Sequence, residues 1–336
     1  MDIQIKKSVL LTPKIKKAWH TMETDVSVSP YLYFNFMKYV WWQTKLFTKF
    51  RPIVYYAIND SGDVIMIAPM KLDIISGKID TLGNKSMCDI TDFLYQKGLT
   101  KDFRRECVLK LRQFIGQPFF LSRLLSDSET LEYLKPYSSL VGSHGCVDIY
   151  LQSDYESHFK QLSKSVRQNI RTAYNRMQKD GINLDFHFYV GGKNIPKSAK
   201  NDSKRCYQKR QLEAYTHALS LTAKVKFFLS VNWARHDNFS LFKNDNSVNA
   251  TLYLNGVVAA CFMGVVNYSK DRIVIPRLAI STEFRKYSPG YVMLCECMKY
   301  LSENTGIRHI DLCRGTEKYK SDLGGREYLT VFVKIQ

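Results

Sequence analysis

The sequence predicts a mixed α/β protein of the α+β class, built from two similar domains in tandem. Strand patterns alternate with helical patterns along the chain, and each half contains a β-hairpin that follows a helical segment. The hydrophobic fraction is 45%, and 13% of the 336 residues are aromatic. This composition supports a packed core and excludes a disordered chain or a coiled coil.

The two hairpins indicate an ancient duplication. The first is expected over residues 53–58 and 64–69, and the second over residues 249–254 and 257–266. The second turn is Asn255-Gly256, a pair that tolerates the positive φ values of a type I′ turn. A chance similarity of two hairpins is the alternative interpretation.

The joint between the two halves is predicted near residues 140–150, because Ser143-His144-Gly145 has turn composition. We therefore expect a first domain over residues 1–145 and a second over residues 146–336. The chain length is compatible with two domains of average size.

The second half continues as alternating helices and strands. The segment from Ser153 to Glu156 has the form of a capping box, and it predicts a helix that runs to about Asp180. Four elements are then expected behind the second hairpin. They are a strand at 272–281, a helix at 289–304, and strands at 309–313 and 328–335.

The charge is unevenly distributed between the halves. The net charge of +18 comes from 49 Lys and Arg against 31 Asp and Glu. Residues 1–150 contain 20 basic and 15 acidic residues, a net charge of +5, and residues 151–336 contain 29 and 16, a net charge of +13. The second half is therefore expected to meet something anionic, such as nucleic acid, a phosphorylated cofactor or an acidic surface.

Cysteine spacing and hydropathy exclude two further classes of protein. The eight cysteines form no CxxC pair at metal-ligand spacing, so we expect reduced buried thiols and no metal site. The longest apolar run, Val257 to Val266, is about half of the roughly twenty residues that a membrane span needs. We expect a cytoplasmic protein without a transmembrane segment.

The segment from Ile280 to Leu294 has the order strand, loop, helix, and it predicts an anion site. Ser288 can cap the helix, Pro289 suits its first position, and Gly290 lets a ligand approach the backbone. Arg285 and Lys286 lie directly before this helix start, whose dipole and free N–H groups would attract a pyrophosphate. A helix that starts with Ser-Pro and binds nothing is the alternative.

The same residues resemble a known family. The stretch Arg285 to Gly290 is similar to the R-x-x-G-x-G/A coenzyme A loop of GNAT acyltransferases, although Ser288 replaces the first glycine. His309 to Lys320 resembles the D-x-x-R-G-x-x-x-Y-K signature of the CelD/FemAB-like branch (BioF-like acetyltransferase domain), and Lys164 to Arg171 resembles its R-x-N-I-R-R region. Similar motifs in the N-terminal half extend the resemblance over nearly the whole chain. They are Trp19, Ser29-Pro30, Ala68-Pro69-Met70 and Asp89 to Phe93.

The resemblance implies two tandem GNAT-like domains, the first of them degenerate, and an N-acyltransferase in the second. The expected reaction moves an acyl group, acetyl in the first instance, from acetyl-CoA or another acyl-CoA to an amine by direct attack in a ternary complex. The resemblance further implies that Leu278 and Ile280 pair with the pantetheine arm. The residues implied around the pyrophosphate are Arg285, Lys286, Tyr287, Ser288, Pro289, Gly290 and Tyr291.

Candidates for the chemistry come from the signature region. Asp311 and Glu317 are candidate bases, and Tyr319 could donate a proton to the leaving thiolate. For Asp311 a structural ion pair is the alternative, for Glu317 a solvated loop position, and for Tyr319 a place in the core. Arg314 and Lys320 are candidate contacts to phosphates or to the acceptor, with internal ion pairs as the alternative. Further candidate contacts are Arg167, Arg171 and His217, with structural or solvated positions as the alternative.

Three functions remain open at this point. The first is the N-acyltransferase that uses acyl-CoA. Within the family its acceptor is a small, lipid-linked or nucleotide-linked amine, often an amino sugar or a cell-envelope or polysaccharide precursor, and such an acceptor would be compatible with contact between the protein and the inner membrane surface. A Fem-type aminoacyltransferase would instead use charged tRNA and the basic region 155–210. A non-catalytic basic GNAT-like protein that binds nucleic acid or acts as a scaffold is the third, although no RNA-binding motif supports it.

Overall fold

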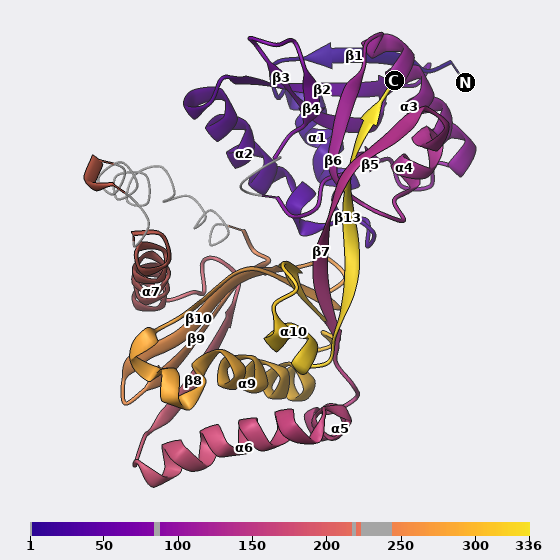
Figure 1. Cartoon of the computed structure of the whole chain (residues 1–336). Helices are drawn as coiled ribbons and strands as arrows, with labels where there is room; N and C mark the ends of the chain where they lie inside the picture. The colour runs from indigo at the N-terminus through magenta and orange to yellow at the C-terminus, as the bar shows by residue number, and fades with distance from the viewer. Residues whose placement is uncertain (1, 84–87, 217–219, 223–243) are drawn as a thin grey trace. The chain divides into compact units, whose positions relative to one another are not determined.

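The computed structural model describes residues 2–83, 88–216, 220–222 and 244–336 (Figure 1). The chain divides into two compact units, the first made of Met1–Cys146 with Tyr328–Gln336 and the second of Val147–Glu327. The last nine residues, which the sequence prediction gave to the second domain, thus belong to the first unit. The reason is their register, because Thr330 to Ile335 pair antiparallel with Leu125 to Phe119.

The first unit contains the first predicted hairpin. Its strands β2 and β3 pair from Phe50↔Asp73 to Ile58↔Val64, within a sheet of order β1-β2-β3-β4 to which β5 adds on β3. The strands of this unit are β1 (Gln4–Ser8), β2 (Phe50–Ile58), β3 (Val64–Asp73), β4 (Ile79–Thr81), β5 (Leu94–Tyr95) and β6 (Phe119–Leu125). The helices are α1 (Pro13–Met22), η1 (Pro30–Leu32), α2 (Phe34–Phe47), α3 (Lys101–Ile115), α4 (Glu129–Leu134) and η2 (Lys135–Tyr137).

The second unit follows the predicted alternation of helices and strands. Its strands lie in a sheet of order β6-β13-β7-β12-β11-β10-β9-β8, in which β11 and β12 form a parallel pair. The strands are β8 (Leu184–Val190), β9 (Ser247–Leu254), β10 (Val257–Val266), β11 (Arg272–Ile280) and β12 (His309–Arg314), and β7 (Ser138–Tyr150) and β13 (Gly325–Ile335) are shared with the first unit. The helices are α5 (Tyr155–Gln161), α6 (Lys164–Lys179), α7 (Lys197–Thr216), η5 (Thr282–Tyr287), α9 (Pro289–Asn304) and α10 (Lys318–Asp322).

The single helix predicted from the capping box is two helices. Asp154, not Ser153, caps α5 by accepting a hydrogen bond from the Ser157 N–H. Ser163 then caps α6 by accepting from the Val166 N–H. Because each cap satisfies orphan N–H groups of a new helix start, the chain interrupts the helix between Gln161 and Lys164.

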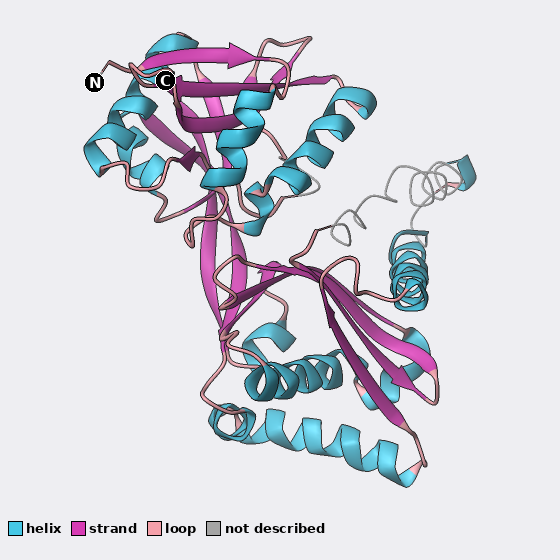
Figure 2. Ribbon diagram, turned by 180° about the vertical axis from the view of Figure 1, so that it is seen from behind, coloured by secondary structure: helices cyan, strands magenta, loops and turns pink. Residues whose placement is uncertain are grey.

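The sheet of the second unit has an apolar face and a polar face. Helices α6 and α9 lie on the apolar face, and α7 lies on the other (Figures 1 and 2). Under α7 the fully buried Asn249 donates hydrogen bonds from Nδ2 to Ser203 Oγ at 2.7 Å and to the Phe262 carbonyl at 3.3 Å. Hydrogen bonds, rather than apolar packing alone, therefore place α7 over β9 and β10.

The pairing of β10 with β11 contains a β-bulge. The register shifts between Met263↔Arg277 and Val265↔Val274, so β11 carries extra residues opposite Gly264. A Cβ on Gly264 would lie 2.5 Å from the Val274 carbonyl oxygen. Only glycine fits this close approach of two backbones.

Replacing Gly264 by alanine is expected to lower the free energy of unfolding by about 2 kcal/mol, because the two strands must separate to accept the methyl group. Urea unfolding followed by fluorescence measures the change. Gly142→Ala is the control, since a Cβ there would meet no atom within 4 Å. Equal stability of the two variants would contradict this account of the bulge.

Candidate functional site

Strand β11 offers a free backbone edge beyond its short pairing with β12. The parallel register covers Arg272↔His309 to Val274↔Asp311, while on its other side β11 stays paired with β10 as far as Ile280. In the described part of the chain no strand pairs with the second half of β11 on the β12 side. Its N–H and C=O groups can therefore bind an extended ligand as an added strand. The half-buried side chains of Leu278 and Ile280 pack against the core behind this edge.

The junction between η5 and α9 depends on the backbone of Ser288. This residue is left-handed, with φ 50° and ψ 54°, and its carbonyl accepts hydrogen bonds from the N–H groups of Tyr291 and Val292. The predicted side-chain cap is wrong, because an N-cap serine has an extended backbone and Ser288 makes no capping bond. A glycine adopts this conformation more readily than a serine. Pro289 starts α9 as predicted.

The two cations before this junction have different surroundings. Lys286 Nζ lies 2.8 Å from Asp180 Oδ2, and the Tyr287 hydroxyl donates to the same oxygen at 2.7 Å. The Asp180 carboxylate raises the pKa of Lys286 to about 12, and the hydrogen bond from Lys286, with that from Tyr287, lowers the pKa of Asp180. Lys286 and Tyr287 therefore hold η5 against the end of α6. The exposed Arg285 side chain has no hydrogen bond or ion pair with the described residues, which leaves it available to an anion.

Gly290 keeps the start of α9 open. It is half-buried, and a Cβ on it would lie 3.4 Å from Ile280 Cγ2, at the tight end of ordinary contact. A larger side chain would fill the space between the helix start and the end of β11. This arrangement leaves Gly290 and Arg285 as the groups most accessible to a phosphate.

Lys320 is an internal residue with an internal ion pair, which is the alternative given for it in the sequence analysis. It is 3% exposed, and its ammonium donates to carbonyl oxygens of four consecutive residues and pairs with Glu317 Oε2 at 3.0 Å. The carbonyl distances are 3.0 Å to Leu312, 3.4 Å to Cys313, 2.9 Å to Arg314 and 2.9 Å to Gly315. One buried cation thus satisfies the carbonyl groups where β12 ends.

Asp311 has structural contacts of the kind given as its alternative role. It is 1% exposed, its Oδ1 accepts from the Cys313 N–H at 2.8 Å, and its Oδ2 lies 3.9 Å from Arg272 Nη1. Glu317 is exposed and paired with Lys320, so it too has a structural partner.

Tyr319 retains a hydroxyl group that can act in catalysis. The half-buried ring packs against the core with its centroid 6.4 Å from that of Tyr291. Burial raises the pKa of Tyr319 to about 12, so the hydroxyl is protonated at neutral pH. No described residue forms a hydrogen bond with it. The Tyr291 hydroxyl, by contrast, donates to Asp322 Oδ2 at 2.7 Å and fixes α9 to α10.

The remaining predicted contacts lie on helix surfaces or at loop ends. Arg167 Nη1 donates to the Lys160 carbonyl at 3.1 Å, and the Arg171 guanidinium lies 5.5 Å from the centre of the Phe159 ring. Both side chains thus join α6 to α5. Arg314 is exposed at the end of β12, and His217 lies outside the described residues.

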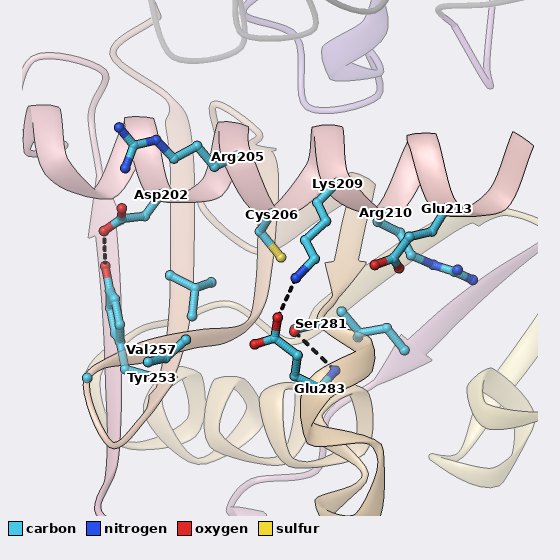
Figure 3. A pocket seen from close by; sticks show the side chains of 13 residues that line it. Asp202, Arg205, Cys206, Lys209, Arg210, Glu213, Tyr253, Val257, Ser281 and Glu283 are labelled. Carbon is cyan, nitrogen blue, oxygen red and sulfur yellow. Dashed lines mark hydrogen bonds and ion pairs between the residues drawn. The ribbon is translucent and has the colours of Figure 1, made fainter. Parts of the chain in front are cut away.

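A pocket of about 370 Å³ lies between α7 and the ends of β10 and β11 (Figure 3). Lys209 forms an ion pair with Glu283 across it, and Glu213 accepts from the Thr282 hydroxyl at 3.2 Å. The pocket reaches Ile280 and Ser281, which end the strand with the free edge. From this segment the sequence analysis took the basic charge and His217 as a candidate contact. The signal that it missed is the spacing of its polar residues, which places one row on one helix face, namely Asp202, Cys206, Lys209 and Glu213.

The described residues show neither a metal centre nor a membrane-spanning helix. No group of three or more His, Cys, Asp or Glu side chains there could hold a metal ion. No described helix has the length and hydropathy that a membrane span requires.

Comparisons with known proteins identify the fold that these two units share. Residues 164–321 match the family model of the acetyltransferase (GNAT) domain. No curated protein gave a significant match.

Solved structures share the fold at low sequence identity. One is a conserved protein of unknown function from Bacteroides thetaiotaomicron, at 11% identity and a TM-score of 0.58 over 99% of this chain and 100% of that one. FemX is 11% identical in sequence, with a TM-score of 0.51 over 98% of this chain and 97% of that one. A tandem GNAT protein from the clavulanic acid biosynthesis pathway is 9% identical, with a TM-score of 0.50 over 99% of this chain and 98% of that one. Residues 164–321, just under half of the chain, thus match a GNAT domain, and the tandem GNAT protein and FemX share the fold over nearly the whole chain. The predicted fold class is thereby confirmed.

The variant Lys320→Met should lower the free energy of unfolding by about 3 kcal/mol, because it leaves buried carbonyl groups without a donor. Lys318→Met is the matched control two residues earlier. The side chain of Lys318 is 83% exposed, so its loss should change stability by less than about 0.5 kcal/mol. Urea unfolding measures both, and similar small effects would show that the carbonyl cluster does not need its cation.

Proposed function

We propose that this protein is an N-acyltransferase that moves an acyl group, acetyl in the simplest case, from an acyl-CoA to an amine in a ternary complex. The observation that carries the proposal is the free edge of β11, which ends beside Arg285 and the start of α9. A pantetheine arm has the amide groups to pair with this edge. Arg285 and the N–H of Gly290 would then hold the pyrophosphate, because helix starts favour anions.

The chain's own residues supply one proton-transfer step. As the amine nitrogen bonds to the thioester carbon, the carbon–sulfur bond breaks and Tyr319 donates its proton to the departing thiolate. The surplus proton of the amine passes through water to the Tyr319 phenolate and restores its hydroxyl group, because Asp311 and Glu317 both have structural partners. The reaction is thus balanced without an acyl-enzyme intermediate.

The pocket beside α7 is the proposed acceptor site. Its volume of about 370 Å³ lies within the range of small-molecule sites. Carboxylates and cations both line it, a mixture that suits a hydroxyl-rich amine. An amino sugar, free or part of a lipid-linked or nucleotide-linked cell-envelope or polysaccharide precursor, has this chemistry. We place the reaction in the cytoplasm, at or near the inner membrane surface.

Acetyl-CoA binding, measured by calorimetry, tests the cofactor assignment. Gly290→Trp should abolish binding, because the indole would fill the space beside Ile280. Arg285→Ala should weaken binding about tenfold through the loss of a charged phosphate contact. Lys286→Ala is the matched control, since its cation already pairs with Asp180, and it should leave affinity nearly unchanged. Binding of tRNA with a steep salt dependence and no binding of acetyl-CoA would instead favour the aminoacyltransferase alternative.

Tyr319→Phe should lower kcat by about 100-fold and leave the KM for acetyl-CoA nearly unchanged, because the hydroxyl acts only as the thiolate departs. A free-thiol assay over a panel of amino sugars measures the rate. Tyr291→Phe serves as the control, because its hydroxyl is engaged with Asp322 and the effect on kcat should be small. A Tyr319→Phe enzyme of near-normal kcat would remove this residue from the mechanism.

A further inference from the structure

The first unit carries an exposed apolar surface that neither the fold nor the proposed reaction uses. It comprises residues from the loop after β1, from α2 and from the turn between β3 and β4. Their exposed fractions range from 44% for Val9 to 78% for Ile75. We call this set the docking surface, and its members are Val9, Leu10, Trp42, Leu46, Ile74 and Ile75.

The docking surface is continuous although its residues come from three segments. One groove of about 450 Å³ is lined by Leu10 and Trp42, among others. A second groove of about 370 Å³ is lined by Val9 and Ile74, and it shares Leu10 with the first. Leu46 follows Trp42 by one helical turn on the same face of α2. Single exposed apolar residues are ordinary, but a connected group indicates an interaction site.

The turn that displays the two isoleucines is held in place by Asp73. Its Oδ1 accepts from the N–H groups of Ile75 at 3.0 Å and Ser76 at 3.3 Å, and its carbonyl accepts from Gly77 at 2.9 Å. Turn tips ordinarily carry polar residues. A well-bonded turn that presents two adjacent isoleucines is suited to insertion into an apolar phase.

The surroundings of the docking surface are cationic. The basic residues that line the two grooves are Lys16, Lys38, Lys45, Lys49 and Arg51, and no carboxylate lines either groove. Lys45 lies 5.1 Å from the centre of the Trp42 ring, and Lys49 pairs with the buried Asp73 at 2.8 Å. A tryptophan and aliphatic side chains within a ring of lysines match the interface of an anionic bilayer.

We propose that this surface docks the protein on an anionic lipid membrane, with Ile74, Ile75 and Leu46 entering the acyl boundary and the lysines meeting the headgroups. Nucleic acid would satisfy the lysines and Trp42, but aliphatic tips offer bases no stacking surface. The lipid surface satisfies both the charge and the exposed aliphatic groups. This inference is independent of the proposed acyl transfer.

Co-sedimentation of the full chain with vesicles tests the proposal. The protein should bind vesicles of phosphatidylcholine with 30% phosphatidylglycerol, by composition, about tenfold more tightly than vesicles of phosphatidylcholine alone. The double variant Ile74→Ser, Ile75→Ser should lose about tenfold in affinity for the anionic vesicles. Leu140→Ser with Val141→Ser is the control, since these residues are 69% and 62% exposed but lie outside the docking surface.

Two charge-reversal variants test the electrostatic contribution to membrane binding. Lys45→Glu should weaken binding to anionic vesicles, whereas Lys101→Glu, with a side chain 76% exposed on α3, should not. Circular dichroism confirms that each variant is folded. Three results would overturn the proposal: no preference for anionic vesicles, equal losses in the isoleucine and control variants, or a change of oligomeric state on removal of the isoleucines. Tight binding of single-stranded RNA that depends on Lys45 but not on the isoleucines would also overturn it.

Discussion

The second unit depends on one contact, in which the buried ammonium of Lys320 donates to the carbonyl oxygens at the end of β12. A parallel strand that leaves its neighbour would expose its carbonyl groups inside the protein, and unpaired buried carbonyls are costly. Lys320 supplies the missing donors from α10. Strand β12 can therefore turn away from β11 after Asp311, and this departure gives β11 its free edge. The site thus owes its open strand to a cation that touches no substrate.

A second constraint fixes the other end of the same edge. Asp180, at the end of α6, binds both Lys286 and Tyr287, and Ser288 then reverses the chain in a left-handed conformation. Because Lys286 is used in this way, the charge offered to a ligand comes from Arg285 alone of the two neighbours. Adjacent cations of like charge therefore have opposite roles, one internal and one available.

Local rules predicted the elements better than the roles of their side chains. Asn255-Gly256 has positive φ at both positions, as the turn chemistry required, and Pro289 starts α9. These outcomes depend on a few neighbouring residues. The pairing of Lys286 depends on Asp180, which lies 106 residues earlier in the sequence, and no local pattern contains this contact. The partners of Lys320 lie only three to eight residues away, but its burial depends on how α10 packs against the end of β12. The contact of Asp311 with Arg272 is likewise not local, because its arginine partner lies on another strand. The residues that resemble the family signature largely build the loop at the end of β12, and the Tyr319 hydroxyl forms no hydrogen bond with a described residue.

The charge of the chain has to be interpreted locally. The net charge of the second half, +13, suggested that this half meets an anion, yet many of its cations serve internal contacts, as Lys286, Lys320 and Arg272 do. The first half has a net charge of only +5, and it nevertheless holds the two grooves that are lined by five basic residues and no carboxylate. Carboxylates elsewhere in that half, such as Asp89 and Glu129, are paired with arginines and do not offset the cations of the docking surface. Attraction to an anionic partner acts over a Debye length of about 8 Å. The strength of this attraction is therefore set by how charges are arranged on a surface and not by their sum over the sequence.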